Sequence, residues 1–171
     1  LSWDLIASKQ LAERLRASEM RFRAVVEAVP SAILVVDDKG NIVLANVQAE
    51  GLFGYPRAEL VGGPVDRLLP ERLRGPHADL RRGYVKAPQT LAMDAGRELV
   101  ALRKDGSEFP VETVLSPMAT DQGLLVLASV VDITHRLEQE QATARHRDEL
   151  AHLSRVAMLG ELSGSLAHEL N

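Results

Sequence analysis

Hydrophobic residues recur at alternating steps of four and three along the first 28 residues. Two of the eight repeat positions are polar, so the seam is interrupted. The eight positions are Leu1, Leu5, Ser8, Ala12, Leu15, Glu19, Phe22 and Val26. This pattern predicts one helix over residues 1–28 that pairs with another helix, most simply the same helix of a second chain. The alternative is that the helix packs against its own domain.

Short hydrophobic runs bounded by turn residues follow, and they predict strands and short helices. Residues 32–37 are apolar and rich in β-branched side chains, which predicts a strand. The turn Asp38-Lys39-Gly40 joins this strand to residues 41–45 as a hairpin. Asn46 is a favourable N-cap for the first of three helices. These helices are expected over residues 47–53, 57–61 and 71–85, and Gly75-Pro76 could delay the start of the third.

The following stretch is rich in strands. We expect them over residues 98–103, 108–115 and 124–131, and Lys104-Asp105-Gly106 forms a tight turn between the first two. Pro110 indicates a sheet edge or a bulge near that point. Two strands, several short helices and three more antiparallel strands predict an α+β domain with one five-stranded sheet.

The last part of the chain predicts one long helix from Thr134 to Asn171, because it contains no proline and is rich in helix-forming residues. Thr134 is the expected N-cap. At about 100° per residue, the leucines near its end share one side, whereas His168 lies about 180° away. Such a stripe cannot be buried by one helix alone, so we expect a parallel homodimer held by the first and last helices. The leucines are Leu159, Leu162, Leu166 and Leu170.

Gly160 and Gly164 are exceptions in this helical composition. Each weakens a helix by about 1 kcal/mol relative to alanine, and their spacing places them on one face. The pair predicts a close helix approach or a local bend near His168. The alternative is that the helix simply tolerates them.

Composition narrows the function classes. Hydrophobic residues make up 46% and charged residues 26% of the 171 residues, as in globular proteins. The net charge of −4 and the lack of a basic block argue against nucleic acid as a partner. There is no cysteine, which excludes disulfides and fits a reducing cytoplasm. No apolar run or signal peptide indicates membrane insertion. The first residue is not methionine, so we expect a piece of a longer protein, which would supply any membrane anchor.

The phrases Leu159-Gly160-Glu161-Leu162 and Ala167-His168-Glu169-Leu170-Asn171 resemble the phospho-acceptor box of bacterial sensor histidine kinases. In that family the histidine attacks the γ-phosphoryl group of ATP, and the next acidic residue helps to take the imidazole proton. The resemblance implies that His168 is the nucleophile and Glu169 its general base or orienting partner. The ATP site would lie in the parent protein, so this chain alone should be inactive. A zinc-protease interpretation needs a histidine four residues after His168, a position beyond Asn171.

Residues 19–134 contain, in this order, the motifs Gly40-Asn41-Ile42, Ala45-Asn46, Leu52-Phe53-Gly54-Tyr55, Arg103-Lys104-Asp105-Gly106 and Asp132-Ile133-Thr134. Together they resemble a PAS domain. The resemblance implies a sheet wrapped around a small cavity, with terminal helices that carry signals. We therefore expect a signalling helix over 1–28, a PAS sensor domain over 29–134, and a linker coiled coil with the first part of the phospho-acceptor helix over 135–171. Asp132 resembles the residue that ties the last strand to the output helix, and Asp132 and Thr134 are the expected coupling residues.

His77 raises the question of a ligand. It precedes the Arg103 turn at an interval similar to that of the iron-binding histidine in haem-containing PAS domains of rhizobial oxygen-sensor kinases, and Arg97 falls near their oxygen-side arginine. A proximal imidazole and a distal donor are what reversible oxygen binding requires. The alternative is a surface or capping histidine beside a cavity without haem. A flavin–cysteine adduct is excluded because the chain has no thiol.

The sequence therefore favours the sensor and transmitter segment of a two-component histidine kinase. The phosphoryl group would pass from His168 to the receiver domain of a response regulator. Two alternatives stay open: a haem-binding gas sensor with His77 as iron ligand, and a ligand-free dimerisation scaffold. The remaining histidines lie on the last helix with charged neighbours and are expected to be solvated, and their spacing forms no metal pair on a helix. They are His135, His146 and His152.

Overall fold

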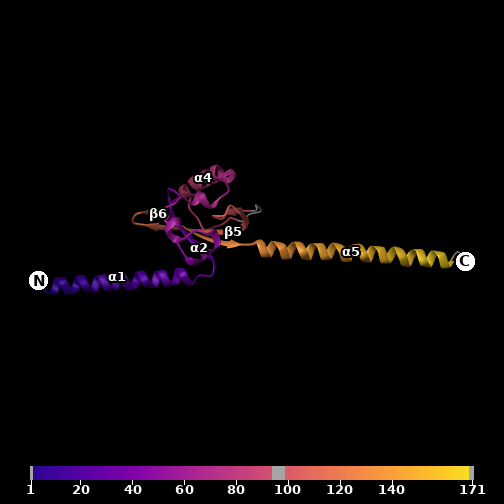
Figure 1. The fold of residues 1–171 in the computed structure, drawn as a ribbon, viewed down its shortest axis with the longest axis horizontal. Helices are drawn as coiled ribbons and strands as arrows, with labels where there is room; N and C mark the ends of the chain where they lie inside the picture. Colours follow the sequence, from indigo (N-terminus) through magenta and orange to yellow (C-terminus); the bar gives the residue numbers. More distant parts are fainter. Residues whose placement is uncertain (1, 94–98, 170–171) are drawn as a thin grey trace. The chain divides into compact units, whose positions relative to one another are not determined.

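The computed structural model describes the backbone of residues 2–93 and 99–169 and the side chains of residues 3–93 and 99–165. By internal contacts the chain divides into two units, Leu1–Asp132 and Ile133–Asn171, and each is described by itself (Figure 1).

The first unit begins with one long helix, and strands and shorter helices follow it in the sequence. Its elements are α1 (Ser2–Ala28), β1 (Ala32–Asp37), β2 (Ile42–Ala45), α2 (Val47–Phe53), α3 (Arg57–Leu60), the 3₁₀ helix η1 (Val65–Leu68), α4 (Glu71–Lys86), β3 (Leu91–Ala92), β4 (Leu99–Leu102), β5 (Glu108–Thr120) and β6 (Gly123–Asp132).

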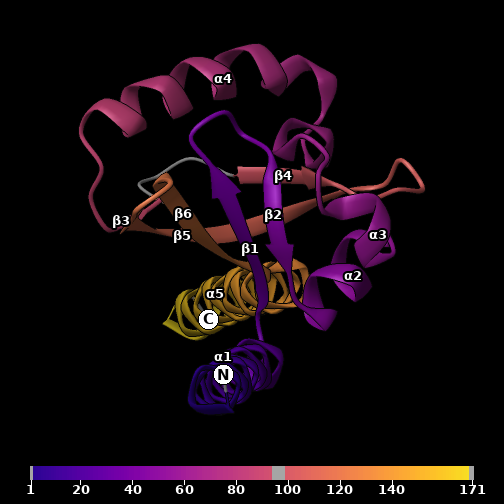
Figure 2. The same cartoon turned by 90° about the vertical axis from the view of Figure 1, so that its left-hand side faces the viewer.

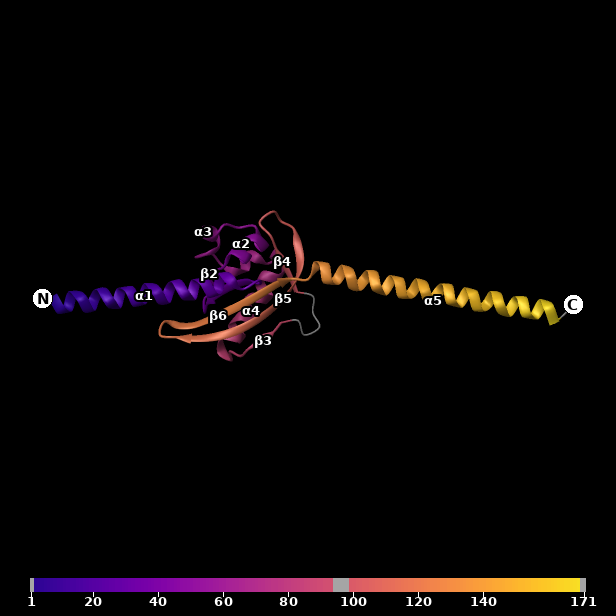
Figure 3. The ribbon, with the colours of Figure 1, turned by 90° about the horizontal axis from the view of Figure 1, so that it is seen from below.

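The strands form one antiparallel sheet in the order β2-β1-β6-β5, and both β3 and β4 pair with β5. The five predicted strands are confirmed, and the two-residue strand β3 is an addition to them. The helices α2, α3 and α4 lie on one side of this sheet (Figure 2 and Figure 3). Pro110 pairs with Val100 on β4, whereas the pairing of β5 with β6 begins one residue later at Val111. Pro110 thus lies at the edge position that its missing N–H group requires.

Alternate residues of the strands bury one face of the sheet against the short helices. Leu34 on β1 and Ile42 on β2 meet Phe53 of α2 and Leu60 of α3 in a core of almost fully buried side chains. Asn46 is the one polar side chain among the described residues in this buried set. The hairpin turn that carries Gly40 has a φ of +89° there, which explains a glycine at that position.

The helix α1 is continuous, as the heptad pattern predicts. Its side chains from Trp3 to Val25 are exposed, and of the described repeat positions only Val26 is buried. Phe22 is 55% and Leu15 68% exposed. Along most of its length, therefore, α1 does not pack against its own domain.

The helix α4 runs without interruption from Glu71 to Lys86, so Gly75-Pro76 does not delay its start. Pro76 lies inside the helix and cannot donate a hydrogen bond to the preceding turn. No side chain of α4 is fully buried.

The second unit is the single helix α5 (Thr134–Glu169). The Leu137 N–H group donates to the Ile133 carbonyl at 3.0 Å. Ile133 therefore occupies the N-cap position, and Thr134 lies in the first turn rather than at the cap where the sequence predicts it. Among the described residues, no helix combines the length and the apolar character that crossing a membrane requires.

Candidate functional site

The predicted phospho-acceptor residues His168 and Glu169 lie in the last turn of α5, and their side chains fall outside the described residues. The helix reaches them without a break from Thr134. Upstream of them, Val156, Leu159 and Leu162 are 52–65% exposed. A stripe of this kind on an isolated helix is available for packing against a second helix.

The glycines near this box make no close contact within the chain. A β-carbon placed on Gly160 or on Gly164 would meet no atom within 4 Å outside the helix backbone. Neither glycine is therefore required by packing inside one chain.

His77 lies on α4 and belongs to an ionic cluster with Asp66 and Arg81. Its Nδ1 atom donates to the Asp66 carboxylate at 2.7 Å, and Arg81 donates to both oxygens of that carboxylate at 2.9 and 3.1 Å. The three side chains are 21–27% exposed. Burial raises the pKa of Asp66, but the hydrogen bonds from Arg81 and His77 outweigh it and hold this pKa below its ordinary value.

This cluster allows a test of the haem hypothesis on the chain's own residues. A histidine that binds a metal usually donates its other ring nitrogen to a carboxylate, and the contact between His77 and Asp66 has that form. This contact engages Nδ1 of His77, so Nε2 is the ring nitrogen that could bind iron. Arg97, the predicted distal donor, lies outside the described residues. No group of three histidine, cysteine, aspartate or glutamate side chains in the described part of the chain could hold a bare metal ion.

Asp132 ends β6 and pairs with Val111 of β5 in the sheet. Its carboxylate accepts a hydrogen bond from Arg103 at 2.7 Å. The Arg103 guanidinium also lies 3.7 Å from the centre of the Phe109 ring, a cation–π geometry. Asp132 is thus held by the turn between β4 and β5. Thr134 has a polar interaction as well.

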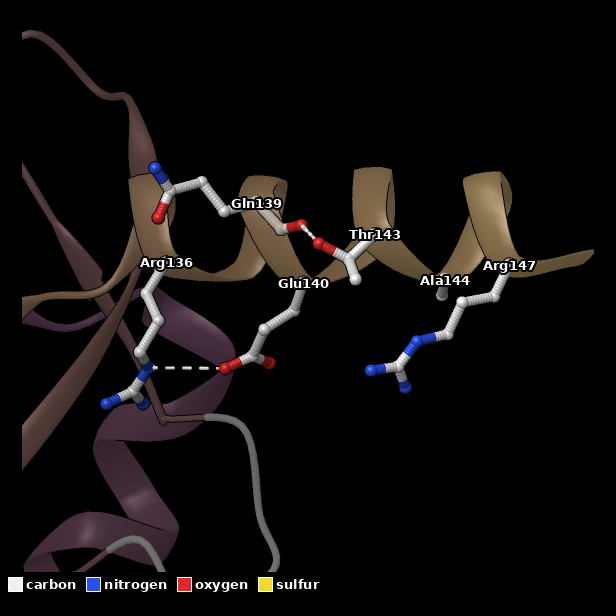
Figure 4. Close-up of a pocket in the computed structure, with 6 residues that line it drawn as sticks. All are labelled: Arg136, Gln139, Glu140, Thr143, Ala144 and Arg147. Atoms are coloured by element: carbon white, nitrogen blue, oxygen red, sulfur yellow. Dashed lines mark hydrogen bonds and ion pairs between the residues drawn. The ribbon is translucent and has the colours of Figure 1, made fainter. Parts of the chain in front are cut away.

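Two surface hollows in the described residues lie on exposed helix faces. Figure 4 shows one of them, which residues of α5 line, among them an ion pair between Arg136 and Glu140 at 3.8 Å. A second lies on α1 beside Leu5 and Ala12. Because a single helix lines each hollow, neither encloses a small molecule.

Sequence reasoning missed some of the contacts described here. It singled out His77, but it did not pair this residue with Asp66 or Arg81. The motif that contains Arg103 does not predict the contact of this residue with Asp132. A carboxylate 11 residues before a histidine gives no periodic signal, so only the fold brings the two together.

Comparison with known proteins identifies the fold. Residues 30–135 match the family model described as a PAS domain. The PAS domain of an HTR-like protein from Haloarcula marismortui superposes with a TM-score of 0.62 at 24% sequence identity, and the match covers 73% of this chain and 99% of that domain. This likeness reflects the fold alone.

Two curated relatives extend the similarity beyond the domain. Sensor protein FixL of Bradyrhizobium diazoefficiens is 31% identical over 168 residues, which cover 98% of this chain and 33% of FixL. Sensor histidine kinase TmoS of Ectopseudomonas mendocina is 27% identical over 159 residues, 92% of this chain and 16% of TmoS. The chain spans a third or less of the length of these relatives. It belongs to the PAS domain family and is homologous over most of its length to sensor histidine kinases.

Proposed function

We propose that this chain is the sensor and signal-transmitting segment of a two-component histidine kinase. In this proposal the PAS domain controls the autophosphorylation of His168 and the transfer of the phosphoryl group to a response regulator. The single observation that carries it is the continuity of α5 from Thr134 to the predicted phospho-acceptor box. Any movement of the first turn of α5 would therefore reach His168 through unbroken helix.

The exposed apolar side chains of both long helices support a homodimer. On α1 they include Leu5, Leu15 and Phe22, and on α5 they include Val156 and Leu159. Burying such stripes against the same helix of a second chain removes apolar surface from water, at about 25 cal/mol for each Å². A parallel pair of α5 helices would leave His168 on the outer side, where a kinase domain could reach it.

The chemistry assigned to the box is phosphoryl transfer to imidazole. A ring nitrogen of His168 forms a bond to the γ-phosphorus of ATP while the bond to the β,γ-bridging oxygen breaks, and ADP leaves. The ring must lose one proton in this step, and Glu169 is placed next in sequence to accept it. The phosphoryl group then passes to an aspartate of the receiver domain. The site that binds ATP belongs to the parent protein.

The decisive experiment uses the parent kinase with radiolabelled ATP. We expect His168→Gln to abolish the acid-labile label, because an amide cannot replace the imidazole nucleophile. His152→Gln is the matched control, since His152 is an exposed histidine on the same helix, and it should be labelled normally. A His168→Gln protein that still carries the label would refute the assignment.

A haem-binding gas sensor is the second candidate, and the contact between His77 and Asp66 is the observation that favours it. When bound, haem would supply an iron atom that can bind a diatomic gas. In this candidate His77 would hold the iron, and Asp66 would orient the His77 ring. Purified protein loaded with haemin should then show a Soret band that His77→Ala loses and His152→Ala keeps.

A further inference from the structure

The short helix α2 is attached at its first residues to the end of α1. Asn46, the N-cap of α2, is fully buried. Its Nδ2 atom donates to the carbonyls of Val26 and Ser31 at 3.2 and 3.0 Å. Its Oδ1 atom accepts from the N–H groups of Ile33 and Ala49 at 2.9 and 3.0 Å. One side chain therefore joins the last turn of α1, the start of β1 and the start of α2.

Glu27 adds a second attachment at the same place. Its carboxylate accepts from the Val47 N–H group, the first of α2, at 2.8 Å. It also forms an ion pair with Arg57 of α3. The hydrogen bond from Val47 lowers the pKa of Glu27, and the Arg57 guanidinium adds to this effect. At pH 7 the carboxylate is therefore charged and faces the positive end of α2.

The other end of α2 is attached to the turn between β4 and β5. The Lys104 N–H group donates to the carbonyl of Phe53, the last residue of α2, at 2.9 Å. The buried Phe53 ring lies 6.0 Å from the Phe109 ring on β5. Because Gly54 closes the helix in the left-handed conformation, with φ at 75°, the α2 helix ends there.

From this turn the contacts continue to the strand end that precedes α5. Arg103 lies over the face of Phe109, and the same guanidinium donates to Asp132. The described contacts thus form an unbroken series from Glu27 at the end of α1 to Asp132, with α2 in the middle.

We propose that α2 is a relay element that couples the end of α1 to Asp132 without any bound ligand. A displacement of the last turn of α1 pulls on Asn46 and Val47, and the seven-residue helix transmits it as a rigid body. Ala49 and Phe53 are buried and hold α2 in place along its length. Phe53 then moves the turn that carries Lys104 and Arg103. The signalling role of this relay rests on the proposed function, whereas the mechanical coupling can be measured on this chain without kinase activity.

The competing route runs through the sheet, because β1 follows α1 in sequence and pairs with β6. The two routes predict different changes in amide hydrogen exchange. A relay through α2 alters the Lys104 amide, which reports on the bond to Phe53. A route through the sheet alters the ladder of β1 and β6, for which the amides of Leu34 and Ala128 are reporters.

The test compares Glu27→Ala with Glu19→Ala by amide exchange on this chain. Glu19 is the matched control, because it forms an exposed ion pair with Arg23 on the same helix and does not touch α2. We expect Glu27→Ala to speed exchange at Lys104 about fivefold, the equivalent of one lost net hydrogen bond. The ladder amides should stay unchanged, and Glu19→Ala should alter none of these positions. Glu27→Gln provides a milder variant in which the fold is retained.

The reverse experiment uses Arg103→Gln. Coupling in equilibrium is reciprocal, so this substitution should speed exchange at Val47 and Ala49, at the far end of α2. The proposal is overturned if Glu27→Ala affects only Val47 and Ala49, if it speeds all amides equally, or if the sheet ladder responds and Lys104 does not.

Discussion

Asn46 shows how one residue serves several elements at once. The sequence predicts it as the N-cap of a short helix, and the structure confirms that Oδ1 accepts from Ala49. The same side chain also accepts a hydrogen bond from the Ile33 N–H group and donates to the carbonyls of Val26 and Ser31. Since every polar atom of this buried amide has a partner, its removal leaves several buried groups without one.

We therefore expect Asn46→Ala to lower the free energy of unfolding by about 2–4 kcal/mol, because an unsatisfied buried polar group costs about 1–3 kcal/mol. Urea unfolding at pH 7 measures this change. Asn41→Ala is the control, since Asn41 is only half-buried and its side chain donates to Asp37 at 3.3 Å. A loss for Asn46→Ala no larger than that of the control would show that the network carries little stability.

Asp66 makes the stability of the fold depend on pH. Its pKa in the folded chain lies below the ordinary value of 3.8. A group with a depressed folded pKa stabilises the fold fully above its unfolded pKa, and this contribution is lost as pH falls through the folded pKa. Unfolding free energy should therefore decline as pH falls below about 5.

Asp66→Asn removes this contribution, so the variant should be less stable at pH 7 and lose less stability on acidification. Urea unfolding at a series of pH values from 7 to about 3 measures both effects. The interpretation fails if the variant keeps the full acid dependence of the native chain.

At the scale of elements, the sequence predicts what its local patterns contain. Residues 32–37 form a strand because they are apolar and β-branched, and β1 has these bounds. Two residues cannot show a period, so β3 was not predicted. The strand β5 extends to Thr120, beyond the predicted residue 115, because the ladder with β6 continues through Ser116 and Pro117. Pairing with a neighbour, rather than local composition, determines where this strand ends.

The same limit applies to the candidate site. His168 and Glu169 were predicted from a contiguous motif, which the sequence displays completely. Glu27 meets Val47 and Arg57 from 20 and 30 positions away. No sequence period reports such a contact, because it depends on how α1 enters the domain. Contacts between elements therefore cannot be predicted from the sequence pattern and are seen only in the structure.

The long helix α5 carries a prediction of its own. Gly160 and Gly164 have open space around them within one chain. If these glycines let two helices approach closely, Gly160→Ala should weaken self-association. The same substitution should stabilise the helix by about 1 kcal/mol, the difference in helix propensity between glycine and alanine. Circular dichroism and sedimentation equilibrium measure the two effects.

Ser165→Ala is the control for this prediction, because it also raises helix propensity and Ser165 lies about 140° around the helix from Gly160. It should leave association unchanged. Equal association of Gly160→Ala and the native chain would favour simple tolerance of the glycines.

At the scale of the whole molecule, most of the exposed large apolar side chains among the described residues lie on the two terminal helices. The core residues of the sheet and of α2 are buried, whereas Leu15 of α1 and Leu159 of α5 are 68% and 65% exposed. Isolated apolar side chains are normal on a protein surface, but stripes of them at helical spacing mark an interaction site. The stripes therefore locate the expected dimer contacts at both ends of the chain.

We predict that this chain is a dimer in sedimentation equilibrium at tens of micromolar and that both helices contribute. Leu15→Gln and Leu159→Gln should each weaken the dimer about tenfold or more, since burying a leucine contributes about 1.5–3 kcal/mol, and together they should yield monomers. Arg16→Gln, one residue off the seam, should have no effect. A native chain that remains monomeric would remove the basis for paired signalling helices. Loss of association in Leu159→Gln alone would place the dimer contact on α5 and leave α1 free for another partner.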